Sequence, residues 1–126
     1  MIVVDTCVWI ESLQNTPTGE HYRDLWTRDS ELIVPTVVQF ELRRWCTRIS
    51  GETAAQQVIS ATRRYQIQPL TEQFALQGAL LAKAHGLAAL DALIYATAQT
   101  LGAQLVSCDA HFEGLPQVDY WPKVAP

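Results

Sequence analysis

Cysteines are few in this sequence, and none stands in a pattern that would use it. Cys7, Cys46 and Cys108 are odd in number and far apart, without a Cys-x-x-Cys pair or a Cys/His spacing. Disulfide frameworks and structural zinc sites depend on such spacings. We therefore expect reduced, buried and inert thiols, and a fold held together by its own hydrophobic core.

Long hydrophobic runs and low-complexity segments are also absent. No apolar stretch approaches the roughly 20 residues that cross a bilayer, and the first residues lack the basic flank and cleavage site of a signal peptide. No linker-like stretch or internal repeat divides the chain. We expect a cytoplasmic protein in which residues 1–126 form a single domain.

Positive charge is in short supply, because 9 lysines and arginines face 13 aspartates and glutamates and the net charge is −4. Phosphate contacts need Lys or Arg, so this balance counts against broad electrostatic binding of nucleic acid. The objection weakens if the acids share one metal site, since two Mg²⁺ ions would cancel four negative charges. The cations also cluster, at Arg43, Arg44 and Arg48 and again at Arg63 and Arg64. These clusters are either RNA contacts or solvated helix faces.

Short apolar runs alternate with helix-like segments along the chain. Strands are expected at residues 2–4, 32–34, near 67–69, 104–107 and 118–121, with helices between them. Gly51, Gly86 and Gly102 mark expected helix ends. The alternation predicts an α/β fold, a three-layer α/β/α sandwich with a central, mainly parallel sheet. Ligands of such sheets bind beyond the carboxyl ends of the strands.

Glu41 interrupts the apolar face of the helix expected after Thr36. Positions 37, 38, 41, 42, 45 and 49 share that face, and all except 41 are apolar. Burying an unpaired carboxylate is unfavourable, so such a group is paired, protonated or metal-bound. Glu41 either pairs with Arg44 or Arg48 along the helix or belongs to a functional site. Its place on the apolar face favours the functional interpretation, because exposed ion pairs need no such place.

Three aspartates have ordinary structural explanations when each is taken alone. Asp5 and Asp91 stand where helices begin and could cap them, and Asp109 follows a strand, where a turn-forming Asp is common. Together they indicate more, because all three and Glu41 are expected at one edge of the sheet. Two unit charges about 4 Å apart repel by about 4 kcal/mol at an effective dielectric near 20. Such a cluster implies a cation, and oxygen ligands suit Mg²⁺ or Mn²⁺.

The acids lie in segments that resemble a known family. The segments are 2–6 (IVVDT), 40–44 (FELRR), 90–98 (LDALIYATA) and 105–112 (LVSCDAHF), and the order and spacing of the acids agree with the family pattern. On these motifs the chain resembles the PIN-domain ribonucleases, most closely the VapC-type toxins of bacterial type II toxin-antitoxin systems. The resemblance spans essentially the whole chain. Each motif alone is weak, but the set is specific.

The resemblance implies a metal-dependent endoribonuclease. It assigns metal binding and catalysis to four acids: Asp5, Glu41, Asp91 and Asp109. One or two Mg²⁺ ions, or Mn²⁺, would activate water and leave 5′-phosphate and 3′-hydroxyl ends on RNA. Thr6 and Ser107 match hydroxyl positions that orient carboxylates or water. His111 stands where the family often has Asp, and as a lone histidine it is left outside the expected site. Related toxins are homodimers inhibited by a VapB-like antitoxin, so both kinds of partner are implied.

Bulky side chains recur at helical spacings in the first two expected helices. They are Trp9, Leu13, Tyr22, Leu25 and Trp26. Such stripes commonly pack in a core. The alternative is an exposed groove that receives an apolar segment of the antitoxin, and the spacing does not separate the two.

Other functions compete with a toxin nuclease. A PIN nuclease of RNA maturation would carry the same acids and differ only in its partners. A non-catalytic PIN scaffold that binds RNA or protein would normally have lost an acid, whereas this sequence retains all four. A phosphoaspartyl transferase of the haloacid-dehalogenase type would have a second Asp at the position of Cys7.

Overall fold

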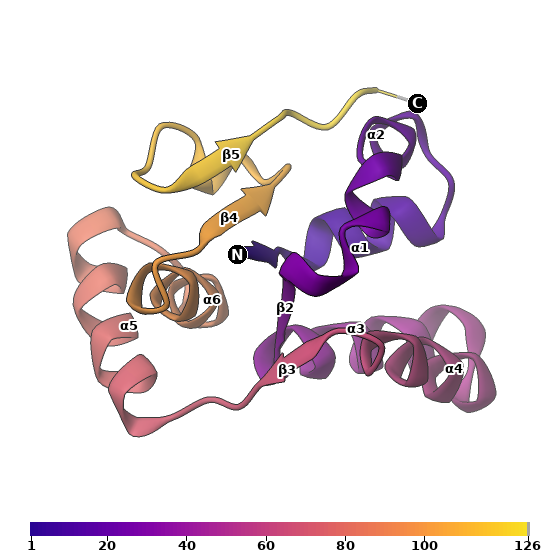
Figure 1. Cartoon of the computed structure of the whole chain (residues 1–126), viewed down its shortest axis with the longest axis horizontal. Helices are drawn as coiled ribbons and strands as arrows, with labels where there is room; N and C mark the ends of the chain where they lie inside the picture. The colour runs from indigo at the N-terminus through magenta and orange to yellow at the C-terminus, as the bar shows by residue number, and fades with distance from the viewer. Residues whose placement is uncertain (126) are drawn as a thin grey trace.

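A parallel β-sheet forms the centre of the protein, and the computed structural model describes residues 1–125 (Figure 1). The strands are β1 (Ile2–Val4), β2 (Leu32–Pro35), β3 (Gln66–Gln68), β4 (Gln104–Ser107) and β5 (Val118–Tyr120). Their order is β3-β2-β1-β4-β5, and every neighbouring pair is parallel. The three inner strands, β2, β1 and β4, are buried except at Gln104, as strands covered on both faces must be.

Helices flank the sheet in packed pairs. They are α1 (Thr6–Leu13), α2 (Pro17–His21), α3 (Thr36–Ser50), α4 (Glu52–Thr62), α5 (Glu72–His85) and α6 (Ala89–Thr100). Helix α1 packs on α2, α3 on α4, and α5 on α6. Figure 1 separates α5 and α6, at the left, from α1 to α4, at the right. The predicted three-layer α/β/α sandwich is confirmed.

Two expected elements differ in detail from the structure. The second expected helix is broken, because α2 ends at His21 and a 3₁₀ helix, η1 (Arg23–Thr27), follows it. The strand expected near 67–69 ends at Gln68, because Pro69 has no backbone N–H to continue the ladder. The other predicted strands and helices lie where the sequence placed them, within one to three residues.

Helices α5 and α6 form a hairpin with well-defined ends. Thr71 caps α5 by accepting a hydrogen bond from the backbone N–H of Phe74 at 3.2 Å, and Gly86 ends it with a left-handed φ of 65°. Within residues 1–125, no single helix is long and apolar enough to cross a membrane. Helices α5 and α6 reach the length and apolar composition of a membrane span only when taken together, and the pair is bent by 113°.

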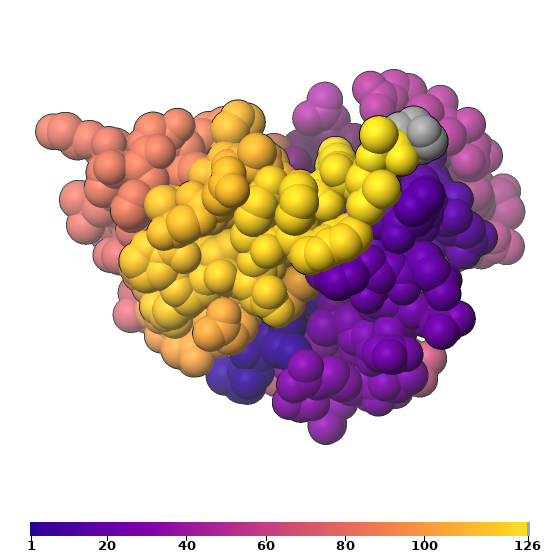
Figure 2. Space-filling view, turned by 90° about the horizontal axis from the view of Figure 1, so that it is seen from above, coloured from indigo at the N-terminus to yellow at the C-terminus, as the bar shows by residue number. Residues whose placement is uncertain are grey.

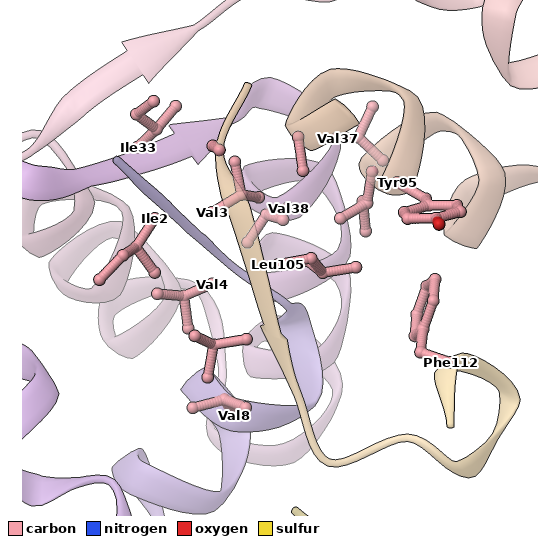
Figure 3. Packing of buried hydrophobic residues seen from close by; sticks show 14 of the residues in the cluster. Ile2, Val3, Val4, Val8, Ile33, Val37, Val38, Tyr95, Leu105 and Phe112 are labelled. Carbon is pink, nitrogen blue, oxygen red and sulfur yellow. The ribbon is translucent and has the colours of Figure 1, made fainter. Parts of the chain in front are cut away.

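The loop that follows β4 is anchored to the hydrophobic core. Figure 3 shows Tyr95 of α6 facing Phe112, at the end of the 3₁₀ helix η3 (Ala110–Phe112). Their rings lie edge to face at 5.9 Å, and both side chains are fully buried. The Tyr95 hydroxyl donates to the carbonyl of Pro116 at 2.7 Å. These contacts fix the path of the segment between β4 and β5.

The C-terminal segment packs against the N-terminal helices, and Figure 2 shows it, in yellow, beside the violet residues of the first third of the chain. Trp121 stacks on His21 with ring centres 3.6 Å apart. The backbone N–H of Val124 donates to the Thr18 hydroxyl at 2.8 Å. The two ends of the described chain therefore hold each other in place.

Candidate metal centre

Neighbouring parallel strands bring Asp5 and Asp109 to one edge of the sheet. Asp5 follows β1 and Asp109 follows β4, and the backbone N–H of Asp5 continues the ladder to the carbonyl of Val106 at 2.9 Å. The Ser107 hydroxyl links the two acids. It donates to Asp5 Oδ2 at 2.7 Å and accepts from the backbone N–H of Asp109 at 3.0 Å. Ser107 thus lies between the two acids.

The Asp5 carboxylate is buried, with 3% of the residue exposed. Its Oδ1 accepts from the backbone N–H of Thr6 at 2.8 Å, so Asp5 also caps α1. Burial raises its pKa well above the ordinary value, and the charges of Cys7 and Asp91 raise it further, against the lowering effect of the hydrogen bonds from Ser107 and Thr6. No lysine or arginine among residues 1–125 forms an ion pair with it.

The cysteines beside this carboxylate are free thiols, as expected, but they are not equally buried. Cys46 and Cys108 are buried, whereas Cys7 is only half-buried. Cys7 Sγ lies 3.5 Å from Asp5 Oδ2 and accepts from the backbone N–H of Cys108 at 3.4 Å. These are weak contacts, and the stronger donors to Asp5 remain oxygen and nitrogen.

Glu41 projects toward the same edge from α3. Its Oε1 accepts from the Thr6 hydroxyl at 2.7 Å, which links α3 to the first turn of α1. Among the described residues it forms no ion pair with Arg44 or Arg48, so the alternative of an arginine partner is wrong. Arg44 instead lies over the ring of Phe40 at 5.5 Å.

The buried apolar face of α3, on which Glu41 was predicted to lie, is shorter than predicted. Val37, Val38 and Leu42 are buried, but Ile49 at the far end of α3 is 55% exposed. Glu41 is half-buried at the margin of this face rather than inside it. A carboxylate there is only partly desolvated and can still be reached by an ion from solvent.

Asp91 lies in the first turn of α6 but does not cap it. The N-cap residue is Ala88, without a side-chain hydrogen bond, so the capping explanation for Asp91 is wrong. Burial raises the pKa of Asp91, and the charges of Asp109 and Glu41 raise it further, while His111 lowers it. Because Asp91 also raises the pKa of Asp5, Asp91 lies within electrostatic reach of each of the other three acids.

His111 lies beside two of the acids, although the sequence prediction left it out. Asp109 accepts from the backbone N–H of His111 at 2.9 Å and caps η3. The ring Nδ1 lies 3.2 Å from Asp109 Oδ1 and 3.8 Å from Asp91 Oδ2. One ligand atom from each of these three residues lies within 4.8 Å of the others. A local sequence signal could have placed His111 near Asp109: Asp109 begins an Asx turn, and His111 lies in this turn just before the buried Phe112.

The chemistry of these donors fits a divalent cation. Asp91 and Asp109 lie close together with His111, Ser107 links Asp5 to Asp109, and Thr6 contacts Glu41. No Lys or Arg among residues 1–125 pairs with any of the four acids. Carboxylate oxygens are the ligands that Mg²⁺ and Mn²⁺ prefer. Asp5, Glu41, Asp91 and Asp109 would hold such an ion, with Thr6 and Ser107 orienting two of the carboxylates.

Comparison with known families adds independent evidence. A family model described as the PIN domain matches residues 2–117, which is most of the chain. This chain belongs to the PIN domain family. No functionally curated protein gives a significant match.

The fold of this PIN domain is similar to that of solved toxin-antitoxin proteins. A chain of the toxin-antitoxin complex from Klebsiella pneumoniae is 22% identical, with a TM-score of 0.79 over 94% of this chain and 96% of that chain. VapC20 of Mycobacterium tuberculosis, described as a sarcin-ricin loop cleaving toxin, is 18% identical, with a TM-score of 0.77 over 92% and 95%. A chain of DNA-bound VapBC from Salmonella typhimurium is 19% identical, with a TM-score of 0.76 over 96% of each chain. These likenesses confirm the PIN-like fold class.

The arginines of α3 lie next to the acidic edge of the PIN domain. An open hollow of about 640 Å³ is lined by Glu41, Arg43, Arg44, Trp45, Thr47 and Arg48. Arg43 forms an ion pair with Glu52 of α4, whereas Arg44 and Arg48 are exposed. Cations and a site acid therefore line one concave surface.

The bulky residues expected in a groove pack mainly inside the PIN domain. Trp9 and Tyr22 are buried, and Leu25 and Trp26 pack against the core. The centre of the Trp9 ring lies 4.4 Å from that of Trp26 and 5.9 Å from that of Tyr65, so these rings form an internal cluster. Burial removes Trp9 and Tyr22 from any direct contact with a partner in this conformation. Of the five residues named for that groove, Leu13 alone, at 41%, is an exposed large hydrophobic.

Proposed function

We propose that this PIN domain is a magnesium-dependent endoribonuclease that hydrolyses RNA phosphodiester bonds and leaves 5′-phosphate and 3′-hydroxyl ends. Mn²⁺ is an alternative metal. Membership of the PIN family supports nuclease activity in general. The observation that supports the finer proposal is that four carboxylates, two from strand ends and two from helices, lie on one side of the sheet, and no Lys or Arg of the described chain forms an ion pair with them.

In this proposal the side chains bind and orient, and none acts as a covalent nucleophile. A bound Mg²⁺ would polarise the phosphodiester and activate water. Both oxygens of Asp5 accept hydrogen bonds, Oδ1 from the backbone N–H of Thr6 and Oδ2 from Ser107, whereas Glu41 accepts from Thr6 at Oε1. These bonds fix the direction of each carboxylate and leave lone pairs on its oxygens for a metal. Asp91 and Asp109 complete the ligand set or position the water.

RNA would approach along the hollow beside Glu41. Arg44 and Arg48 are exposed there and form no ion pair in the part of the chain that is described, so their charges are available for phosphates. Arg43 is partly engaged by Glu52 and would contribute less. This arrangement explains how a chain of net charge −4 would attract RNA, because the cations lie beside the metal site.

We further propose that the nuclease is the toxin of a type II toxin-antitoxin pair, acts as a homodimer and is inhibited by a VapB-like antitoxin. The support is the likeness in fold to chains of toxin-antitoxin complexes from two bacteria. A short neighbouring gene for a repressor-like protein would identify the partner. Its co-purification with this chain, and loss of RNA cleavage in the complex, would be the expected result; a chain that the partner leaves active would instead favour a role in RNA maturation.

The nuclease proposal is tested by comparing the full chain with Asp5→Asn and Asp91→Asn on total RNA, in Mg²⁺ and in chelator. We expect cleavage by the unaltered chain in Mg²⁺ only, and a loss of at least about a hundredfold in each variant. Asp119→Asn, at an exposed position of β5, is the matched control and should cleave normally. Cleavage that persists in both site variants or in chelator would overturn the proposal. A ligation assay specific for 5′-phosphates checks the ends.

A further inference from the structure

We propose that the His111 imidazole is a direct metal ligand, together with Asp91 and Asp109, and that it shifts the preference of the site from Mg²⁺ toward Mn²⁺. This inference rests on the proposed function, because it assigns a further ligand to the same centre. The sequence gives no reason to include His111, which is a lone histidine in a loop. The geometry supplies the reason.

Three ligand atoms converge from two segments of the chain. His111 Nδ1 lies 3.2 Å from Asp109 Oδ1 and 3.8 Å from Asp91 Oδ2, and one ligand atom from each residue lies within 4.8 Å of the others. Atoms bound at about 2.1 Å to one ion, at right angles, are about 3 Å apart. The two distances from His111 Nδ1 are thus close to those that a shared ion requires, and the third separation is no greater than 4.8 Å.

The loop anchors the backbone of His111 on both sides. On one side the backbone N–H of His111 is bonded to Asp109 at 2.9 Å. On the other side Phe112 is fully buried against Tyr95. The backbone of His111 is therefore anchored while its side chain remains 74% exposed and open to an arriving ion. Anchoring of the backbone lowers the entropy lost when the side chain binds an ion.

The competing explanation is an ion pair between a charged His111 and the two aspartates. Such a pair would be exposed on the histidine side, and exposed ion pairs contribute about 0–1 kcal/mol. It would also leave three or more carboxylates sharing one positive charge. A divalent ion between the same three residues neutralises more charge and uses the ring nitrogen as a donor of electrons.

A nitrogen ligand changes which ion the centre prefers. Mg²⁺ takes oxygen ligands almost exclusively, whereas imidazole suits transition metals, and Mn²⁺ accepts oxygen and nitrogen together. The same centre with Asp at position 111 would present oxygen alone. The substitution His111→Asp therefore replaces nitrogen by oxygen and should favour Mg²⁺.

The decisive measurement is the pulsed electron paramagnetic resonance spectrum of Mn²⁺ bound to the full chain without an affinity tag. A directly bound imidazole gives ¹⁴N modulation of the Mn²⁺ spin echo, and carboxylates do not. We expect this modulation in the unaltered chain and its loss in His111→Asp and His111→Asn. His85→Asn, at an exposed histidine of α5, is the matched control and should retain it. Calorimetric titrations with Mn²⁺ and Mg²⁺ should show the ratio of their affinities falling about tenfold in His111→Asp.

The outcomes separate this inference from the proposed function. If Mn²⁺ binds, Asp91→Asn abolishes binding and the unaltered chain shows no ¹⁴N modulation, His111 is not a ligand and the nuclease proposal stands. Modulation that survives in His111→Asp also overturns the inference. If neither ion binds to the unaltered chain, the metal-dependent function itself fails. The spectrum of the unaltered chain decides the first case without relying on any variant.

Discussion

Replacing Asp91 by asparagine should stabilise the metal-free protein at neutral pH while removing its response to metal. Carboxylate oxygens of Asp91 and Asp109 lie within 4.8 Å, and at that separation two charges repel by about 3.5 kcal/mol at an effective dielectric near 20. The side chains are 20% and 32% exposed, so solvent screening reduces this to about 1–2 kcal/mol. The variant loses a first-turn acid, which costs about 0.3–1 kcal/mol. The net gain is about 1 kcal/mol, or about 3 °C in Tm.

The direction of the pH dependence follows from the pKa of Asp91, which burial raises above its ordinary value. An acid whose pKa is higher in the folded state contributes stability below its unfolded pKa, near 3.9, and loses that contribution as pH rises through the folded pKa. The unaltered protein should therefore weaken relative to Asp91→Asn as the pH is raised from about 4 to 7. Near pH 4 the two proteins should be nearly equal in stability.

Urea denaturation at pH 4 and pH 7, in chelator and in Mg²⁺, measures these differences. A metal present at a hundred times its Kd stabilises the unaltered chain by about 2.7 kcal/mol, and the variant should gain almost nothing, so Mg²⁺ reverses the order of stability. The reasoning is refuted if Asp91→Asn is the less stable protein in chelator at pH 7. An equal gain from Mg²⁺ in both proteins would equally exclude Asp91 as a ligand.

Two further substitutions test the positioning of the site and the packing beside it. Thr6→Val removes the hydroxyl that donates to Glu41 at 2.7 Å, so the rate of Mg²⁺-dependent RNA cleavage should fall about tenfold or more. Thr6→Ser keeps a hydroxyl and should restore the rate. Equal cleavage rates for the unaltered chain and Thr6→Val would show that the bond does not orient Glu41. Gly19→Ala would place a Cβ 2.2 Å from the Glu11 carbonyl oxygen, and this clash should cost about 1–3 kcal/mol in a urea titration. An unchanged midpoint there would contradict the close approach of α1 and α2.

Much of the fold follows from local patterns, and so does part of the site. Ile2–Val4 and Gln104–Ser107 are recognisable as buried strands, and their pairing places Asp5 and Asp109 together. The position of His111 beside Asp91 could not be predicted, because this contact joins a loop to another helix and no spacing along the chain records it. Helical spacing likewise could not show that Tyr65 covers Trp9, so the core and groove interpretations stayed equal until the structure was known.

The choice of partners around the acids would tie the stability of this PIN domain to a bound metal. An ordinary buried carboxylate is paired with Lys or Arg, which would neutralise it and leave no place for an ion. Here the partners of Asp5 and Glu41 are the hydroxyls of Ser107 and Thr6 and a backbone N–H, which fix direction without supplying charge. Burial raises the pKa of Asp5 and of Asp91, and the repulsion between the acids raises it further. A bound divalent ion would remove this repulsion. The repulsion lowers the stability of the metal-free fold, and the same free energy would be recovered when the ion binds, so it would add to the affinity for the ion.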